Sequence, residues 1–176
     1  MSELAFTHQL DLRFVRVADL ASWLIAKRET GVKRYTHVGA ITDPDSYRLR
    51  YEFGARAHVD GSLTGEPGVQ RRPLDYATFE YQALVSIPVT AWEHEHFWLA
   101  LDRIQGWRYS RRSILGFVGF EFKDEHGFIC SATDLWGFRN ADMLPRELRS
   151  DIRDMDPQDT YNFALGLREG RNARAS

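Results

Sequence analysis

The sequence contains a single cysteine, Cys130, among 176 residues. A lone cysteine excludes a disulfide bond within the chain and any zinc site built from several thiolates. An excess of one charge is also lacking, because 23 basic residues stand against 25 acidic ones. Without an overall basic field, we do not expect nucleic acid as a partner.

Long apolar runs are absent as well. No stretch approaches the roughly 20 apolar residues that span a membrane. The first residues also lack the basic and apolar segments of a secretory signal. We therefore expect no membrane span and synthesis in the cytoplasm, with release by lysis or by dedicated export left open.

We expect neither a cofactor nor a metal ion. The one histidine-rich segment, residues 93–96, lies where a helix is predicted. Residues two positions apart point to different sides of a helix, so His94 and His96 are not expected to share an ion. A solvated helix face is the better interpretation of this segment.

The hydrophobic pattern mixes strands and helices along the chain. Alternation predicts strands at 10–15, 35–41, 47–53 and 79–88, and helical spacing predicts helices at 18–27, at 91–105, from Ser110, and after Cys130, Pro145 and Pro157. We expect a long irregular loop at 54–72 and a frayed tail from residue 168. The order indicates an α+β fold in one domain, with a core at about 10–168.

Two of these helices carry start signals. Thr90 and Glu93 have the spacing of a capping box. Asp156 precedes Pro157 and is the expected N-cap of the last helix.

Cys130 lies where a short apolar run ends and a segment with helical spacing begins. Ala132, Leu135 and Trp136 can share one face of that segment. Free backbone N–H groups and the helix dipole favour a thiolate at such a position, and the thiolate is the nucleophilic form. Cys130 is therefore a candidate nucleophile, and the alternative is a small buried hydrophobic residue.

His37 is the candidate base. It opens an apolar strand far upstream of Cys130. Paired in space with the thiol, it would act first as a general base and then as an acid. The alternative is a structural histidine held by hydrogen bonds.

Short motifs follow one another in an order that points to one family. They are Asp11-Leu12-Arg13-Phe14, Ala21-Ser22-Trp23-Leu24-Ile25, Tyr35-Thr36-His37-Val38-Gly39, Tyr51-Glu52, Gly68-Val69-Gln70-Arg71-Arg72-Pro73-Leu74, Gly106-Trp107-Arg108-Tyr109 and Ile129-Cys130-Ser131. Over about residues 10–165 the chain resembles the circularly permuted papain-like hydrolases. These form the permuted branch of the NlpC-type cell-wall peptidase and amidase superfamily.

The resemblance implies a permuted papain-like fold, with an antiparallel sheet packed against helices and the cysteine at a helix N-terminus. Cys130 would be the nucleophile, His37 the base and Glu52 the residue that orients the imidazole, while Tyr109 would line the substrate site. The backbone N–H of Cys130 would help to stabilise the oxyanion. For the third position His58 remains a second candidate, and Glu52 could instead be a solvated strand carboxylate.

The implied activity is hydrolysis of an amide bond through a thioester acyl-enzyme, with peptidoglycan peptides as the substrate class. One alternative is an acyltransferase or thioesterase that acts on lipid or protein acyl groups. Another is a catalytically inactive binding protein on the same fold, encoded by a phage or used against a bacterial partner. The sequence leaves the oligomeric state open.

Overall fold

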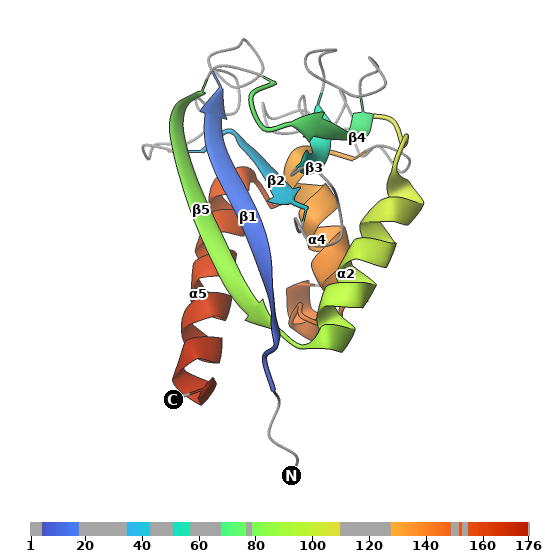
Figure 1. The fold of residues 1–176 in the computed structure, drawn as a ribbon. Helices are drawn as coiled ribbons and strands as arrows, with labels where there is room; N and C mark the ends of the chain where they lie inside the picture. The colour runs from blue at the N-terminus through green and yellow to red at the C-terminus, as the bar shows by residue number, and fades with distance from the viewer. Residues whose placement is uncertain are drawn as a thin grey trace.

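The computed structural model describes residues 5–17, 35–42, 51–56, 68–76, 79–109, 128–148, 152 and 155–175. In these ranges the elements are β1 (His8–Val17), β2 (His37–Ile41), β3 (Tyr51–Arg56), β4 (Gly68–Pro73), β5 (Phe79–Val89), α2 (Ala91–Ile104), α4 (Cys130–Asn140), a short 3-10 helix η1 (Arg146–Leu148) and α5 (Pro157–Ala175) (Figure 1). This composition is α+β, as the sequence predicts.

The five strands form one antiparallel sheet in the order β4-β3-β2-β1-β5. β1 lies between β2 and β5 and pairs with β5 along its whole length, from His8 opposite Val89 to Val17 opposite Phe79. The ladder between β2 and β3 is short and joins only Ala40 to Phe53 and Ile41 to Glu52. It therefore ends before it reaches the N-terminal end of β2.

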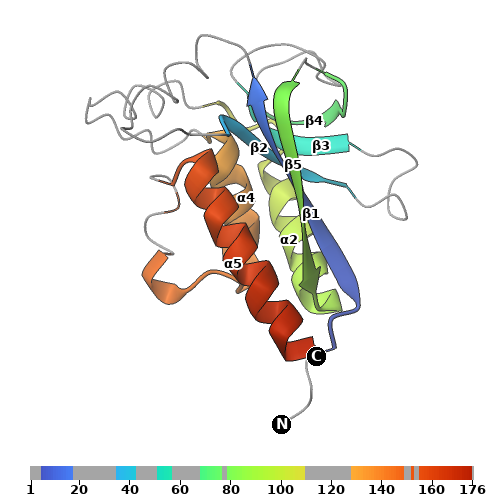
Figure 2. The same ribbon diagram turned by 90° about the vertical axis from the view of Figure 1, so that its left-hand side faces the viewer.

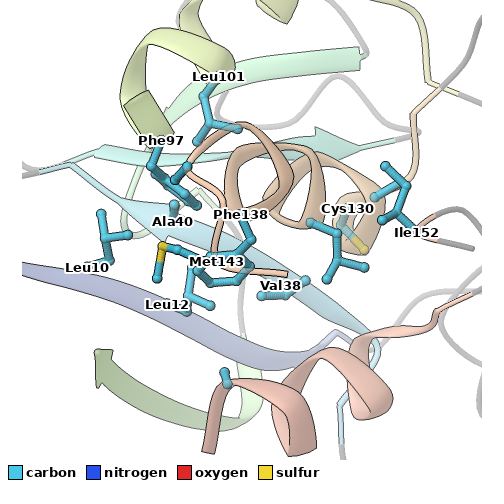
Figure 3. Close-up of a cluster of buried hydrophobic side chains, with 14 of the residues drawn as sticks. Leu10, Leu12, Val38, Ala40, Phe97, Leu101, Cys130, Phe138, Met143 and Ile152 are labelled. Carbon is cyan, nitrogen blue, oxygen red and sulfur yellow. The ribbon is translucent and has the colours of Figure 1, made fainter. Parts of the chain in front are cut away.

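The helices α2, α4 and α5 lie on the same side of the sheet (Figures 1 and 2). α4 packs against β2 and β3, α2 packs against α4 and β1, and α5 packs against β5. Alternate residues of β1 and β2 face these helices because successive strand side chains point to opposite faces. The resulting core includes Phe14. It also includes Leu10, Leu12, Val38, Ala40, Phe97, Leu101 and Phe138 (Figure 3).

Local start signals are confirmed. The Thr90 hydroxyl accepts a hydrogen bond from the Glu93 backbone N–H, and the Glu93 carboxylate accepts one from the Thr90 backbone N–H. This is the reciprocal capping box, and the helix that it opens buries Trp98, Leu101 and Ile104. Asp156 accepts from the backbone N–H groups of Gln158 and Asp159 and so caps α5.

The prediction of an irregular loop over residues 54–72 is wrong at both ends. β3 runs on to Arg56, and β4 begins at Gly68. The side chain of Arg72 is 1% exposed, and its guanidinium donates to the carbonyl oxygens of Gly54 and Gly68 at 2.9 and 3.1 Å. Glycine and charged residues interrupt the apolar alternation in these two segments, so the sequence does not predict strands there. The strands are stabilised by pairing of β3 with β4.

The backbone at the start of β4 requires a glycine at position 68. Its φ of 118° lies in the left-handed region, and a Cβ there would lie 2.4 Å from the carbonyl oxygen of Trp107. The backbone N–H of Val69 donates to that same oxygen at 3.0 Å. The close approach joins β4 to the segment after α2 and needs glycine.

The prediction of a frayed tail from residue 168 is also wrong, because α5 continues to Ala175. Arg171 binds the Glu93 carboxylate with two hydrogen bonds, of 2.6 and 2.8 Å, and donates to the Pro88 carbonyl oxygen. These contacts anchor the end of α5 to the start of α2. The predicted helices at 18–27 and from Ser110, together with residues 47–50 and His58, lie outside the described residues.

Candidate active site

Cys130 is the first residue of α4. The N-cap residue, Ile129, has no side-chain acceptor, so no side chain caps this helix end. Cys130 is 4% exposed and belongs to the buried core, as does Val38, the second residue of β2 (Figure 3). α4 as a whole packs against β2, the strand that begins at His37.

Two hydroxyl groups hold the first turn of α4 in place. Ser131 donates to the carbonyl oxygen of Met155 at 2.7 Å, and Thr133 donates to that of Ile129 at 3.0 Å. Both side chains are fully buried. Their hydroxyl protons are committed to backbone carbonyls, which suits a positional role.

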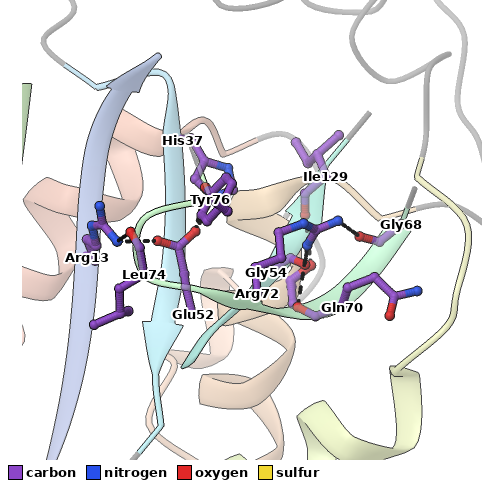
Figure 4. Close-up of polar contacts among 11 residues, drawn as sticks. Arg13, His37, Glu52, Gly54, Gly68, Gln70, Arg72, Leu74, Tyr76 and Ile129 are labelled. Carbon is purple, nitrogen blue, oxygen red and sulfur yellow. Dashed lines mark hydrogen bonds and ion pairs between the residues drawn. The ribbon is translucent and has the colours of Figure 1, made fainter. Parts of the chain in front are cut away.

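His37 and Glu52 form a buried pair on neighbouring strands (Figure 4). His37 Nε2 lies 2.7 Å from Glu52 Oε1, and the two side chains are 6% and 1% exposed. The interpretation of Glu52 as a solvated carboxylate is therefore wrong. An ionised carboxylate only accepts hydrogen bonds, so Nε2 carries the proton and Nδ1 is the basic nitrogen of the neutral ring.

Two glycines make room for this pair. A Cβ at Gly39 would lie 2.5 Å from Glu52 Cγ, so the Glu52 side chain occupies the space that any other residue at 39 would fill. A Cβ at Gly54 would lie 3.2 Å from the Val38 carbonyl oxygen and 3.5 Å from His37 Cε1. The glycine two positions after His37 thus has a direct packing role in the candidate site.

Two further residues, Tyr76 and Arg13, touch Glu52. The Tyr76 hydroxyl donates to Glu52 Oε1 at 2.8 Å, and an Arg13 guanidinium nitrogen lies 3.5 Å from Oε2. Burial raises the pKa of Glu52, but the charge and hydrogen bond of His37, the Tyr76 hydroxyl and the Arg13 charge together lower it below its ordinary value. Glu52 is therefore an ionised partner for the imidazole at neutral pH.

Sequence reasoning missed Tyr76 as a site residue. It lies in the turn after β4, where neither spacing nor strand alternation marks it. Arg13 occurs in the first of the quoted motifs, but nothing in the motif links it to Glu52. Both contacts depend on the tertiary arrangement of β1, β3 and the turn.

Asp134 is a second buried carboxyl group, on α4. It is fully buried, and neither carboxyl oxygen has a hydrogen-bond partner. Burial raises its pKa well above the ordinary value and the charge of Glu52 adds to this, while the Ala40 backbone N–H lowers it in part. The environment favours the neutral acid.

Tyr109 lies near the start of α4 through its backbone. It forms a parallel bridge with Phe128, and the Phe128 backbone N–H donates to the Arg108 carbonyl oxygen at 3.0 Å. Phe128 leads directly into Ile129 and Cys130. The structure thus brings the Tyr109 segment alongside the approach to α4, and its role in binding substrate stays a prediction.

No model of a known protein family matches this chain, and no curated protein matches it either. Among the described residues, no group of three histidine, cysteine or acidic side chains could hold a metal ion. In the same ranges, none of the helices is both long and apolar enough to cross a membrane.

Proposed function

We propose that the protein is a cysteine hydrolase that cleaves an amide bond, with peptidoglycan peptides as the substrate class. Cys130 is the nucleophile, His37 the general base and acid, and Glu52 the residue that orients His37. The substrate class follows from the resemblance of the motifs to permuted papain-like hydrolases.

In the proposed reaction, His37 takes the proton of the Cys130 thiol, and the thiolate attacks the carbonyl carbon of the amide. The tetrahedral intermediate collapses as His37 gives that proton to the leaving amine, which leaves a thioester on Cys130. Water then attacks the thioester while His37 accepts a proton from it. The acid product leaves, and the proton returns to the thiol.

The buried contact between His37 and Glu52 is the observation that supports this proposal most strongly. The hydrogen bond at 2.7 Å fixes the ring plane and leaves Nδ1 as the proton acceptor. The ionised carboxylate balances the charge of the imidazolium that forms in each half-reaction. α4, which begins at Cys130, packs against the strand that begins at His37.

The first experiment measures the rate of alkylation of Cys130 by iodoacetamide from pH 5 to 10, in the wild type and in His37→Ala. Because the chain has one cysteine, every modified thiol is Cys130. We expect the wild-type rate to rise with a midpoint below the value of about 8.5 for a free thiol. His37→Ala should move the midpoint back toward that value.

A substrate assay then separates the enzymatic alternatives. Purified peptidoglycan fragments are incubated with the protein and with Cys130→Ala, and new amino and carboxyl ends are detected by mass spectrometry. Turnover of acyl thioesters with no cleavage of peptides would favour the acyltransferase or thioesterase alternative. Equal product from both proteins would exclude Cys130 as the nucleophile.

One observation favours a second candidate, a catalytically inactive binding protein on this fold. Cys130 is only 4% exposed and packs in the hydrophobic core, as a structural cysteine does. In that case the thiol resists iodoacetamide until the protein unfolds, and His37→Ala leaves its reactivity unchanged.

A further inference from the structure

Tyr76 covers the contact between His37 and Glu52. Its side chain is buried, and its ring meets the His37 ring edge-on, with centroids 6.3 Å apart (Figure 4). On its other side it meets Phe79 edge-on at 5.4 Å. The backbone N–H of Tyr76 donates to the Pro73 carbonyl oxygen, so the turn that carries the ring is itself fixed.

The two oxygens of Glu52 have unequal surroundings. Oε1 lies within hydrogen-bond distance of both His37 Nε2, at 2.7 Å, and the Tyr76 hydroxyl, at 2.8 Å. Oε2 is buried and has no hydrogen-bond partner. Its neighbour is an Arg13 nitrogen at 3.5 Å, longer than a normal hydrogen bond.

Arg13 is held just short of a strong contact with Glu52. Its guanidinium donates to the Leu74 carbonyl oxygen and lies over the Phe79 ring, 4.2 Å from the centroid. Arginine and carboxylate form short, charge-assisted hydrogen bonds when geometry allows it. A small rotation of the Glu52 carboxylate toward Arg13 would gain such a bond and would weaken the contact with His37.

We propose that Tyr76 is a positioning residue whose hydroxyl holds the Glu52 carboxylate toward His37 and against the attraction of Arg13. As a statement about the catalytic site, this rests on the proposed function, but the contact itself exists whether or not Cys130 reacts. Tyr76 touches neither the nucleophile nor the substrate in this scheme. It acts through the orientation of Glu52.

The test is an NMR titration of His37 in Tyr76→Phe, which removes the hydroxyl and keeps the ring. The spectra are recorded in a Cys130→Ala background, so that titration of the thiol does not contribute, and the His37 signal is assigned by its absence in His37→Ala. We expect the titration midpoint of His37 to fall by about one pH unit, or tenfold in proton affinity, because the imidazolium loses its close anion.

Two controls bracket this shift. Glu52→Gln removes the anion entirely and should lower the midpoint at least as much as Tyr76→Phe does. Tyr81→Phe removes a hydroxyl from a half-exposed tyrosine of β5 and should leave the midpoint unchanged. A midpoint in Tyr76→Phe that equals the wild-type value, or exceeds it, would overturn the proposal.

A double variant tests the competition directly. Arg13→Met keeps an apolar stem over Phe79 and removes the charge, so adding it to Tyr76→Phe should return the His37 midpoint toward the wild-type value. Without this rescue, the role given to Arg13 is wrong. Ordinary thiol reactivity of Cys130 combined with a lowered midpoint would contradict the proposed enzyme and leave the positioning contact intact.

Discussion

Asp134 should destabilise the folded protein at neutral pH, and the penalty should grow as the pH rises. The carboxyl group is fully buried on α4 and has no hydrogen-bond partner at either oxygen. Burial and the nearby charge of Glu52 raise its pKa well above the ordinary value. The folded state therefore keeps a proton that the unfolded chain releases above about pH 4.

The sign follows from proton counting. Stability rises with pH where the unfolded state binds more protons, and it falls where the folded state binds more. Asp134 belongs to the second case from about pH 4 up to its raised folded-state pKa. Over that interval each pH unit costs about 1.4 kcal/mol of unfolding free energy.

The perturbation is Asp134→Asn, which keeps the size of the side chain and removes the titration. Between pH 5 and pH 7 the stability of the variant relative to the wild type should grow by about 2.7 kcal/mol if the acid stays neutral throughout. The measurement is urea unfolding at pH 5, 6 and 7, with the free energy taken from the midpoint and slope. Asp75→Asn, at an exposed position in the turn after β4, is the matched control and should show no such growth.

A wild type and an Asp134→Asn variant with the same pH dependence would refute this reasoning. It would mean that the folded protein ionises Asp134 as readily as the unfolded chain does. A gain that is constant with pH would point to a steric cause for the effect. Only a difference that widens with pH identifies the buried acid.

Three other substitutions or conditions have definite expected outcomes. Gly39→Ala places a Cβ 2.5 Å from Glu52 Cγ and should cost about 1–3 kcal/mol in urea unfolding, whereas Gly166→Ala, where a Cβ meets nothing within 4 Å, should cost nothing. Arg171→Met should lower the free energy of unfolding by about 1–3 kcal/mol, because it leaves a largely buried Glu93 without its partner. It should also speed amide hydrogen exchange in residues 168–175. Unchanged exchange would contradict the role of Arg171 as an anchor of α5. Burial raises the pKa of Glu93, but its hydrogen bonds with Arg171 and Thr90 lower it overall, so wild-type stability should fall as the pH drops below about 4.5, and Arg171→Met should show less of this loss.

Short-range signals were sufficient for the α+β class and for several of its elements. The capping box at Thr90 and Glu93 and the cap at Asp156 are local motifs, and the structure confirms both. Alternation in β1 and β5 predicted those strands because each has one buried face over part of its length. Together these elements indicate the α+β class.

Long-range contacts explain what was missed. α5 runs past residue 168 because Arg171 reaches Glu93, on a helix far away in the sequence. Arg72 looks like a surface residue, yet its charge is buried against the carbonyl oxygens of β3 and β4. No local pattern contains this information, because Arg171 and Glu93 are 78 positions apart and Arg72 and Gly54 are 18 apart.

In the candidate site, too, some residues could be predicted from the sequence and others depend on long-range contacts. Cys130 and His37 could be singled out from the sequence because each opens an element, and Glu52 through the resemblance of the motifs. The surroundings of Glu52 could not, since Tyr76, Arg13 and Gly39 meet it only in three dimensions. Arg13 and Gly39 both occur in quoted motifs, Gly39 in the one that contains His37, but neither motif links its residue to Glu52.

Glu52 and Asp134 show why these surroundings decide the chemistry. Both carboxyl groups are almost fully buried, and burial alone would keep both neutral. Glu52 has two hydrogen-bond donors and a nearby cation, whereas for Asp134 the Ala40 backbone N–H offsets burial only in part, so their pKa values move in opposite directions. The raised pKa of Asp134 keeps a second negative charge from forming near Glu52. Glu52, whose pKa is lowered, is the carboxylate that faces the His37 imidazole, while Asp134 favours the neutral acid.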